Sequence, residues 1–308
     1  MKGNMVLLEF LLFPGLLFTA VAGLLTSWVD RKVTALVQMR VGPPFFQPFY
    51  DIRKLLIKET CVPEDGSIGL FLLAPLLGLA AVTLASMILW RTLLDAEVTF
   101  VGDLIVLVYL LLMPALGVML GAFASRNPLA SLGGSREVKL MIAYELPLVL
   151  AILVPVIHAN SIRLGDLFMG QAPVLRISGV LALLVAISCM QAKLTIVPFD
   201  MPEAETELSG GALIEYSGPP LAMFKITRAM MLFTMPVLLV VLFFGGLVSG
   251  PGWLPPVIGF LVWFVLVAIT IVIRNTTPRV RTDQAVRFFW GPVSVVAALA
   301  VVLAWLGW

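Results

Sequence analysis

The chain has 308 residues, of which 60% are hydrophobic and only 12% are charged, and its mean hydropathy is +1.06. This composition excludes an ordinary soluble domain and indicates a polytopic membrane protein. A net charge of +2 gives no indication of nucleic-acid binding.

Eight apolar runs are long enough to cross a bilayer core of about 30 Å as helices. Uninterrupted runs of this length exclude barrel strands, and backbone polar groups in lipid must bond internally. We therefore predict an all-α, polytopic integral membrane protein with a single transmembrane domain over residues 1–308. The runs cover residues 5–29, 68–90, 104–124, 140–157, 174–197, 229–248, 253–273 and 290–308.

The first run contains Ala20-Val21-Ala22, which imitates a signal-peptide cleavage site. The run is longer than a signal peptide requires, and only Lys2 precedes it as a basic residue. We expect a retained helix.

Basic residues predict the orientation of the chain. Sixteen of the 20 Lys and Arg residues lie in or next to the connections after the first, third, fifth and seventh runs. Positive residues favour the cytoplasmic side. We therefore expect a multi-pass protein of the plasma membrane, with these charged connections in the cytoplasm and both termini outside.

The connection after the first run, residues 30–67, is too long and too charged for a simple turn. Within residues 47–59, Phe49, Ile52 and Leu55 share one helical face, and charged residues occupy the rest. We predict a cytoplasmic amphipathic helix that lies at the membrane interface or beneath a partner.

The connection after the fifth run holds five acids in PFDMPEAETELSGGALIEYSG, residues 198–218. In one interpretation the stretch is a solvated loop, in which Asp200 caps a short helix and Glu203 takes its third position. Glu203 and Glu207 would then repel each other as i,i+4 neighbours. In the other, carboxylates gathered beside apolar helices exchange protons near neutral pH and form a relay. The candidates are Asp200, Glu203, Glu205, Glu207 and Glu215.

Glu145 lies about 9 Å into the fourth run, counted from Lys139. A carboxylate at that depth costs about 2.5–3.5 kcal/mol unless it faces protein or water. We expect a relay role for Glu145, with a structural role as the alternative, and we expect Glu9 near the outer end to snorkel.

Several basic residues lie near these acids: Lys193, Lys225, Arg228 and Arg274. They are either ordinary cytoplasmic anchors or counter-charges that pair with the acids and set which are ionised. No catalytic, metal-binding or cofactor-binding motif is present, because the two cysteines are far apart and His158 is the sole histidine.

Four segments resemble the signature blocks of the subunit-1-like membrane subunit of respiratory complex I, which is also called its H subunit. They are DRKVTALVQMRVGPPFFQPFYDIRKLLIKE, SREVKLMIAYELPL, PFDMPEAETELSGGALIEYSG and TTPRVRTDQAVRFFW. They are more similar still to the corresponding subunit of membrane-bound, energy-converting nickel–iron hydrogenases. The first block is shorter than in complex I, and Lys225 and Arg228 follow the acidic block where complex I members have aromatic and acidic residues.

The resemblance implies a subunit that is not catalytic alone. It would dock a cytoplasmic arm of hydrogenase-like large and small subunits, which hold the nickel–iron centre and iron–sulfur clusters. Its carboxylates, including the helix-borne Glu145, would link redox events to neighbouring antiporter-like subunits. The residues expected to dock the arm are Arg40, Gln47, Asp51, Lys54, Arg279 and Asp283.

Our hypothesis is therefore a coupling subunit of a ferredoxin-linked, hydrogen-evolving complex that translocates protons or sodium ions. The alternatives are a quinone-chamber subunit of complex I and a passive membrane anchor of the redox arm.

Overall fold

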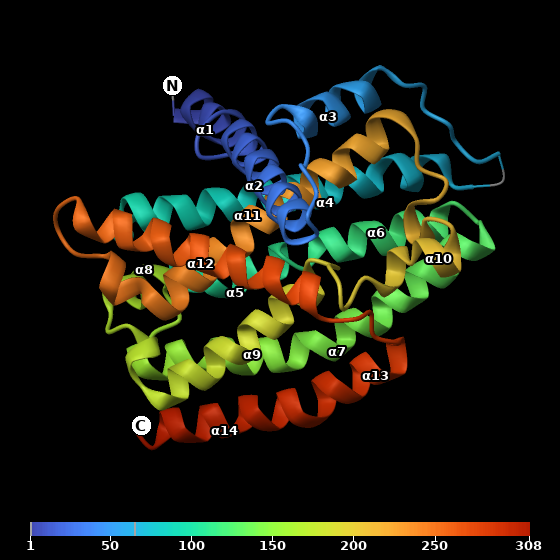
Figure 1. The fold of residues 1–308 in the computed structure, drawn as a ribbon. Coiled ribbons are helices and arrows are strands. Elements are labelled where there is room, and N and C mark those ends of the chain that lie inside the picture. The colour runs from blue at the N-terminus through green and yellow to red at the C-terminus, as the bar shows by residue number, and fades with distance from the viewer. Residues whose placement is uncertain (1, 65) are drawn as a thin grey trace.

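The computed structural model describes residues 2–64 and 66–308, and the side chains of residues 2–6, 205 and 206 lie outside the description. Within these ranges all regular structure is helical and no strand occurs, which confirms the predicted all-α class (Figure 1). The α-helices are α1 (Lys2–Leu11), α2 (Leu16–Val37), α3 (Gln47–Ile57), α4 (Ile68–Leu94), α5 (Asp103–Leu110), α6 (Met113–Ala124), α7 (Pro128–Ala159), α8 (Leu164–Met169), α9 (Ile177–Lys193), α10 (Glu205–Leu208), α11 (Gly218–Val248), α12 (Leu254–Thr276), α13 (Thr282–Phe288) and α14 (Ser294–Trp305). Four 3-10 turns cover Ala96–Val98, Pro173–Leu175, Met201–Glu203 and Gly211–Leu213, and a π-helical turn, Phe289–Val293, joins α13 to α14.

Seven helical segments of the described chain are long and apolar enough to cross a membrane. They are Leu7–Val37, Ile68–Leu94, Asp103–Ala124, Pro128–Ala159, Gly218–Val248, Leu254–Thr276 and Thr282–Trp305. The remaining predicted run, residues 174–197, corresponds to α9, an apolar helix of 17 residues, or about 26 Å at 1.5 Å per residue. Because α9 is shorter than the usual ~20 residues, the count of eight spans remains a prediction.

Two predicted runs are interrupted. Residues 5–29 fall on α1 and α2, with Pro14 and Gly15 at the break. Proline lacks the backbone N–H that a continuous helix requires. Residues 104–124 fall on α5 and α6, and Pro114 occupies the first turn of α6, where a missing N–H costs little.

Two helices begin well before their apolar runs. The side chain of Asn127 accepts a hydrogen bond from the N–H of Leu129 at 2.8 Å, and α7 begins there rather than at residue 140. Helix α11 begins at Gly218 rather than at residue 229. Polar residues do not end a helix, so hydropathy alone misplaces both boundaries, and much of the predicted 125–139 connection is helical.

Helix α11 is the central element of the fold. Its most apolar window is 78% buried, against 28% for that of α12. It packs against α2, α4, α12 and α8. A Cβ on Gly23 of α2 would lie 2.5 Å from the carbonyl oxygen of Ala229, so a small residue permits this close crossing, as is common between membrane helices.

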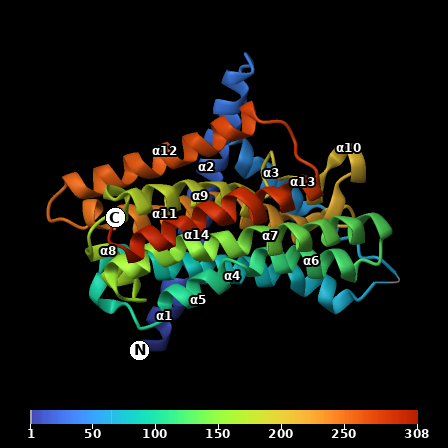
Figure 2. The same ribbon diagram turned by 90° about the horizontal axis from the view of Figure 1, so that it is seen from below.

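The long helices other than α2 run roughly side by side, and α2 is steeply inclined to them (Figures 1 and 2). One end of the bundle holds α8 and the C-terminus, and the opposite end holds α10 and α13 (Figure 1). We call the second end, with α3 and residues 198–217 and 277–281, the charged end.

Candidate functional site

The acidic stretch folds closely against α7 at the charged end. Gly211 has a φ of +59°, and a Cβ there would lie 1.9 Å from the carbonyl oxygen of Pro202. A Cβ on Gly133 of α7 would lie 2.5 Å from the backbone nitrogen of Ala212. Only glycine permits these approaches, so the glycines of the loop and of α7 hold the acids against the helix bundle.

Tyr216 anchors the end of this loop. Its hydroxyl donates to the carbonyl oxygen of Phe71 at 2.9 Å, and the two rings stack with centroids 4.0 Å apart. Burial raises the pKa of the Tyr216 phenol above its ordinary value. The phenol therefore remains a neutral hydrogen-bond donor at physiological pH.

Each described acid of the stretch contacts a different partner. Asp200 accepts from Arg279 (Nε to Oδ1, 2.8 Å), Glu203 from Arg228 (2.5 Å), Glu207 from Arg136 (2.5 Å) and Glu215 from the Asn127 amide (2.5 Å). The predicted cap is wrong, because the Asp200 side chain makes no bond to the turn that it precedes. The i,i+4 pair is also wrong, because Glu203 and Glu207 lie on separate helical turns. The side chain of Glu205 lies outside the described residues.

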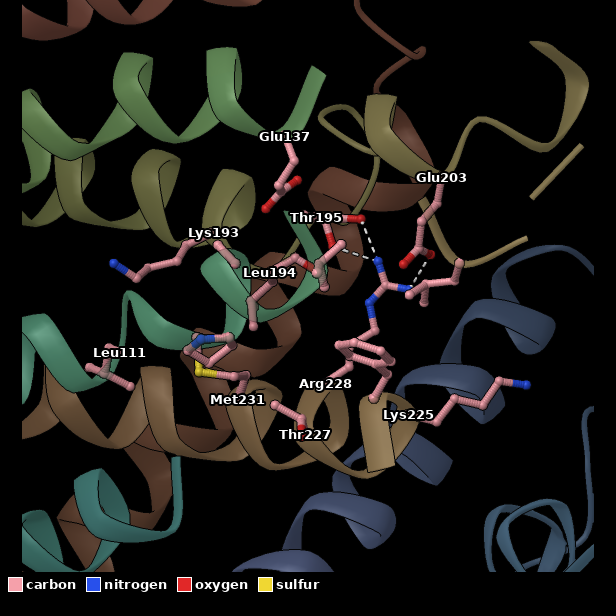
Figure 3. Close-up of a pocket in the computed structure, with 15 residues that line it drawn as sticks. Leu111, Glu137, Lys193, Leu194, Thr195, Glu203, Lys225, Thr227, Arg228 and Met231 are labelled. Atoms are coloured by element: carbon pink, nitrogen blue, oxygen red, sulfur yellow. Dashed lines mark hydrogen bonds and ion pairs between the residues drawn. The ribbon is translucent and has the colours of Figure 1, made fainter. Parts of the chain in front are cut away.

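A small cavity of about 120 Å³, which we call the inner cavity, lies beside this loop (Figure 3). Its ionisable lining residues are Glu137, Lys193, Glu203, Lys225 and Arg228. Arg228 forms part of its wall, since its guanidinium bonds Glu203 and also donates to the carbonyl oxygen and hydroxyl of Thr195 at 3.1 and 2.5 Å. The inner cavity therefore connects one acid of the loop with groups on α7 and α9.

Glu137 is the candidate site residue that sequence reasoning missed. It is 2% exposed, and its Oε2 has no hydrogen-bond partner in the described structure. The predicted fourth span began at residue 140, so Glu137 was assigned to a connection. Asn127-Pro128 was the missed signal, because this pair is a typical helix start. Extending α7 back to it puts Glu137 and Tyr144 on one face, seven residues and ~11 Å apart.

Glu145 and Lys193 form an ion pair between α7 and α9, with Nζ 3.3 Å from Oε2. The Lys193 side chain is 2% exposed and that of Glu145 is 24% exposed. The Lys193 ammonium also lies 5.4 Å from the centroid of the Tyr144 ring, a cation–π distance. Lys193 lines the inner cavity as well, so it stands between that cavity and Glu145.

Two other expected counter-charges, Arg274 and Lys225, do not pair with a described acid of the loop. Arg274 pairs with Asp30 of α2 rather than with an acid of the loop. Lys225 makes no ion pair with any described acid. Glu9, which we expected to snorkel, pairs with Arg91, so its carboxylate has a protein partner.

The residues expected to dock a partner lie at the charged end. Gln47 and Arg31 both donate to Asp51, at 3.0 and 2.7 Å. Burial alone would raise the pKa of the Asp51 carboxyl, but the hydrogen bonds from Arg31 and Gln47 and the charges of Arg31 and Lys225 hold it below its ordinary value. Asp51 therefore remains ionised at neutral pH. Three further side chains are exposed: Arg40, Lys54 and Asp283.

In the described part of the chain, no group of three or more His, Cys, Asp or Glu residues could hold a metal ion. Cys61 is exposed, Cys189 is buried and both are free thiols. His158 lies at the opposite end of α7 from the acidic loop, where Arg176 donates to its Nδ1 at 2.9 Å.

The chain matches a family described as NADH dehydrogenase over residues 9–305. A protein of Brevibacillus brevis, named as the H subunit of NADH-quinone oxidoreductase, is 35% identical, over 96% of this chain and 92% of the relative. The protein of the same name from Geobacillus thermodenitrificans is 36% identical, over 94% and 91%.

Among solved structures, the chain is similar to one in the membrane-bound sulfane sulfur reductase (MBS), an archaeal respiratory membrane complex. The TM-score is 0.84 at 26% sequence identity, over 97% of this chain and 99% of the other. The fold thus recurs over nearly the whole of both chains.

Proposed function

Because the chain belongs to the NADH dehydrogenase family of membrane subunits, we propose that it is the coupling subunit of an energy-converting respiratory complex. In this role it catalyses no redox reaction itself. It docks a redox arm at the charged end and passes protonation changes sideways to ion-translocating membrane partners.

One observation carries this proposal. The inner cavity joins Glu203 of the acidic loop to Glu137 of α7 and to Lys193, which pairs with Glu145. A cavity of about 120 Å³ has room for water molecules that bridge carboxylates, since one water needs only ~10–15 Å³ of such volume. These groups therefore line one cavity that extends from the loop into the bundle.

The inner cavity suggests how coupling operates. Arg228 donates a 2.5 Å hydrogen bond to the side chain of Glu203. A change of charge in the arm above the loop weakens or strengthens the Arg228–Glu203 hydrogen bond, and Glu203 then exchanges a proton with Glu137 across the inner cavity. Lys193 responds to the charge on Glu137 and shifts the balance of its pair with Glu145. Asp200, Glu205, Glu207 and Glu215 supply protons from the cytoplasmic side.

We further propose that the complex is of the ferredoxin-linked, hydrogen-evolving type. The hydrogenase-like large and small subunits would hold the nickel–iron centre and the iron–sulfur clusters, and antiporter-like subunits would adjoin Glu145. The similarity to a chain of a sulfane sulfur reductase supports a complex other than a quinone reductase. The charged end would face the cytoplasm from the plasma membrane, in accord with its basic residues.

The second candidate is the quinone-reducing branch, which the names of the curated relatives favour. The deciding experiment uses the native complex purified with this chain. Reduced-ferredoxin-dependent hydrogen evolution, quinone reduction and sulfane sulfur reduction are assayed side by side, and nickel is determined. Hydrogen evolution with nickel supports our proposal, whereas quinone reduction without nickel, or sulfur reduction without hydrogen evolution, refutes the hydrogenase assignment.

A further inference from the structure

A second and larger cavity, which we call the chamber, lies at the charged end. Its volume is about 550 Å³, within the ~300–1,000 Å³ typical of ligand pockets. Its walls come from α2, α3, α11 and residues 194–203, with Arg274 and Arg279 completing the lining. The Arg228–Glu203 pair lines both the chamber and the inner cavity.

Ionisable residues make up nine of the nineteen lining residues of the chamber. Its four acids each pair with one arginine: Arg31 with Asp51, Arg274 with Asp30, Arg279 with Asp200, and Arg228 with Glu203. Lys225 is the fifth cation. Five cations against four acids leave the chamber with a net charge of +1.

Lys225 is exposed near the start of α11, and it has no hydrogen bond or ion pair with a described residue. The arginines around it are already held by carboxylates. The charge of Lys225 acts on Asp51 only from beyond ion-pair distance. An ammonium without a hydrogen-bonded carboxylate in a ligand-sized cavity favours one anionic group, because a charge-assisted hydrogen bond is stronger than a neutral one.

The rest of the chamber is suited to an amphiphile. Leu24, Pro48, Ile52 and Leu232 supply apolar lining beside the charged groups. Outside the chamber, α2 and α3 carry exposed apolar side chains such as Leu17 and Leu56. In a membrane-spanning protein such surfaces contact acyl chains, so the chamber lies next to the lipid headgroup region, where α3 would lie as an interfacial helix.

We propose that the chamber binds the headgroup of an anionic phospholipid, with Lys225 pairing its phosphate. A neutral quinone ring has no charge to pair with the Lys225 ammonium, and placing an apolar ring among nine charged side chains would desolvate them without compensation. The site goes beyond the proposed coupling role and does not depend on it, since it stands on the pairing of charges around Lys225. A bound headgroup there would also brace α3 against α2 and α11.

The experiment uses the delipidated native complex and native mass spectrometry to count bound molecules against concentration. The probes are dihexanoyl phosphatidylglycerol, dihexanoyl phosphatidylcholine, inorganic phosphate and decylubiquinone. The variants are Lys225→Gln, which removes the charge, and Lys225→Arg, which keeps it. Lys58→Gln is the matched control, because Lys58 is an exposed lysine at the end of α3 that does not line the chamber.

We expect one saturable phosphatidylglycerol site in the wild type, in Lys225→Arg and in Lys58→Gln. The affinity should fall about tenfold or more in Lys225→Gln. Unchanged affinity in Lys225→Gln overturns the proposal. The proposal is also overturned if the wild-type complex binds phosphatidylcholine as tightly as phosphatidylglycerol, and this comparison needs no variant. Inorganic phosphate binding as tightly overturns the lipid assignment, and displacement of the lipid by decylubiquinone assigns the chamber to quinone.

Discussion

Replacing Glu137 with glutamine separates a relay role from a structural one. The amide has nearly the volume of the carboxylate, so packing around the inner cavity is preserved. Glutamine cannot take up or release a proton near neutral pH. If Glu137 passes protons between Glu203 and the Lys193–Glu145 pair, Glu137→Gln breaks the route without disturbing assembly.

The structure sets the expected magnitudes. Glu137 is 2% exposed, with an unpartnered Oε2. A buried polar group without a partner costs about 1–3 kcal/mol, and an ionised one costs more. A neutral amide should therefore leave the free energy of unfolding unchanged or raise it by about 1 kcal/mol. Ion transport should fall by at least about tenfold. This figure is below the ~10²–10⁴-fold by which a positioned proton-transfer group raises a reaction rate.

The assay places the purified complex in liposomes and measures ion uptake per electron transferred, beside the midpoint of thermal unfolding. Glu97→Gln is the matched control, because Glu97 is an exposed acid between α4 and α5, remote from the acidic loop in the sequence. Wild-type ion uptake in Glu137→Gln would refute the relay. A loss of stability that parallels the loss of transport would assign Glu137 a structural role instead.

Three further substitutions test the site. Lys193→Met leaves Glu145 without its partner and should destabilise the complex by about 1–3 kcal/mol. This cost is lower than the ~3–5 kcal/mol of breaking a fully buried pair, because the Glu145 side chain is 24% exposed. The double variant with Glu145→Gln should regain most of the lost thermal midpoint, and additive losses of the two variants would contradict the pairing. Gly211→Ala places a Cβ 1.9 Å from a carbonyl oxygen, so the acidic loop should be displaced and become susceptible to limited proteolysis. Gly69→Ala, with no atom within 4 Å of its Cβ, should be digested at the wild-type rate. Glu207→Gln should reduce ion uptake less than Glu137→Gln, because the Glu207 side chain is 51% exposed and water can replace it; an equal loss would mean that Glu207 is an obligatory step.

Composition and apolar run length determined the class of this protein from the sequence alone. A bilayer requires about 20 apolar residues per helix, and that requirement is local, so an all-α membrane protein followed without tertiary information. The acidic stretch and the depth of Glu145 were also evident, because charge is rare in so apolar a chain.

The tertiary structure decided the partners and the helix boundaries. Pairing of Asp200 with Arg279, or of Arg274 with Asp30, joins residues far apart in the sequence, and no local pattern specifies such contacts. Glu137 was hidden because polar first turns of α7 resemble a connection until Asn127 is recognised as its cap. Among the cations that line the chamber, Lys225 makes no ion pair with a described residue, and this depended on every other pair there being known. Burial and pairing are properties of the packed bundle, whereas hydropathy is a property of the chain.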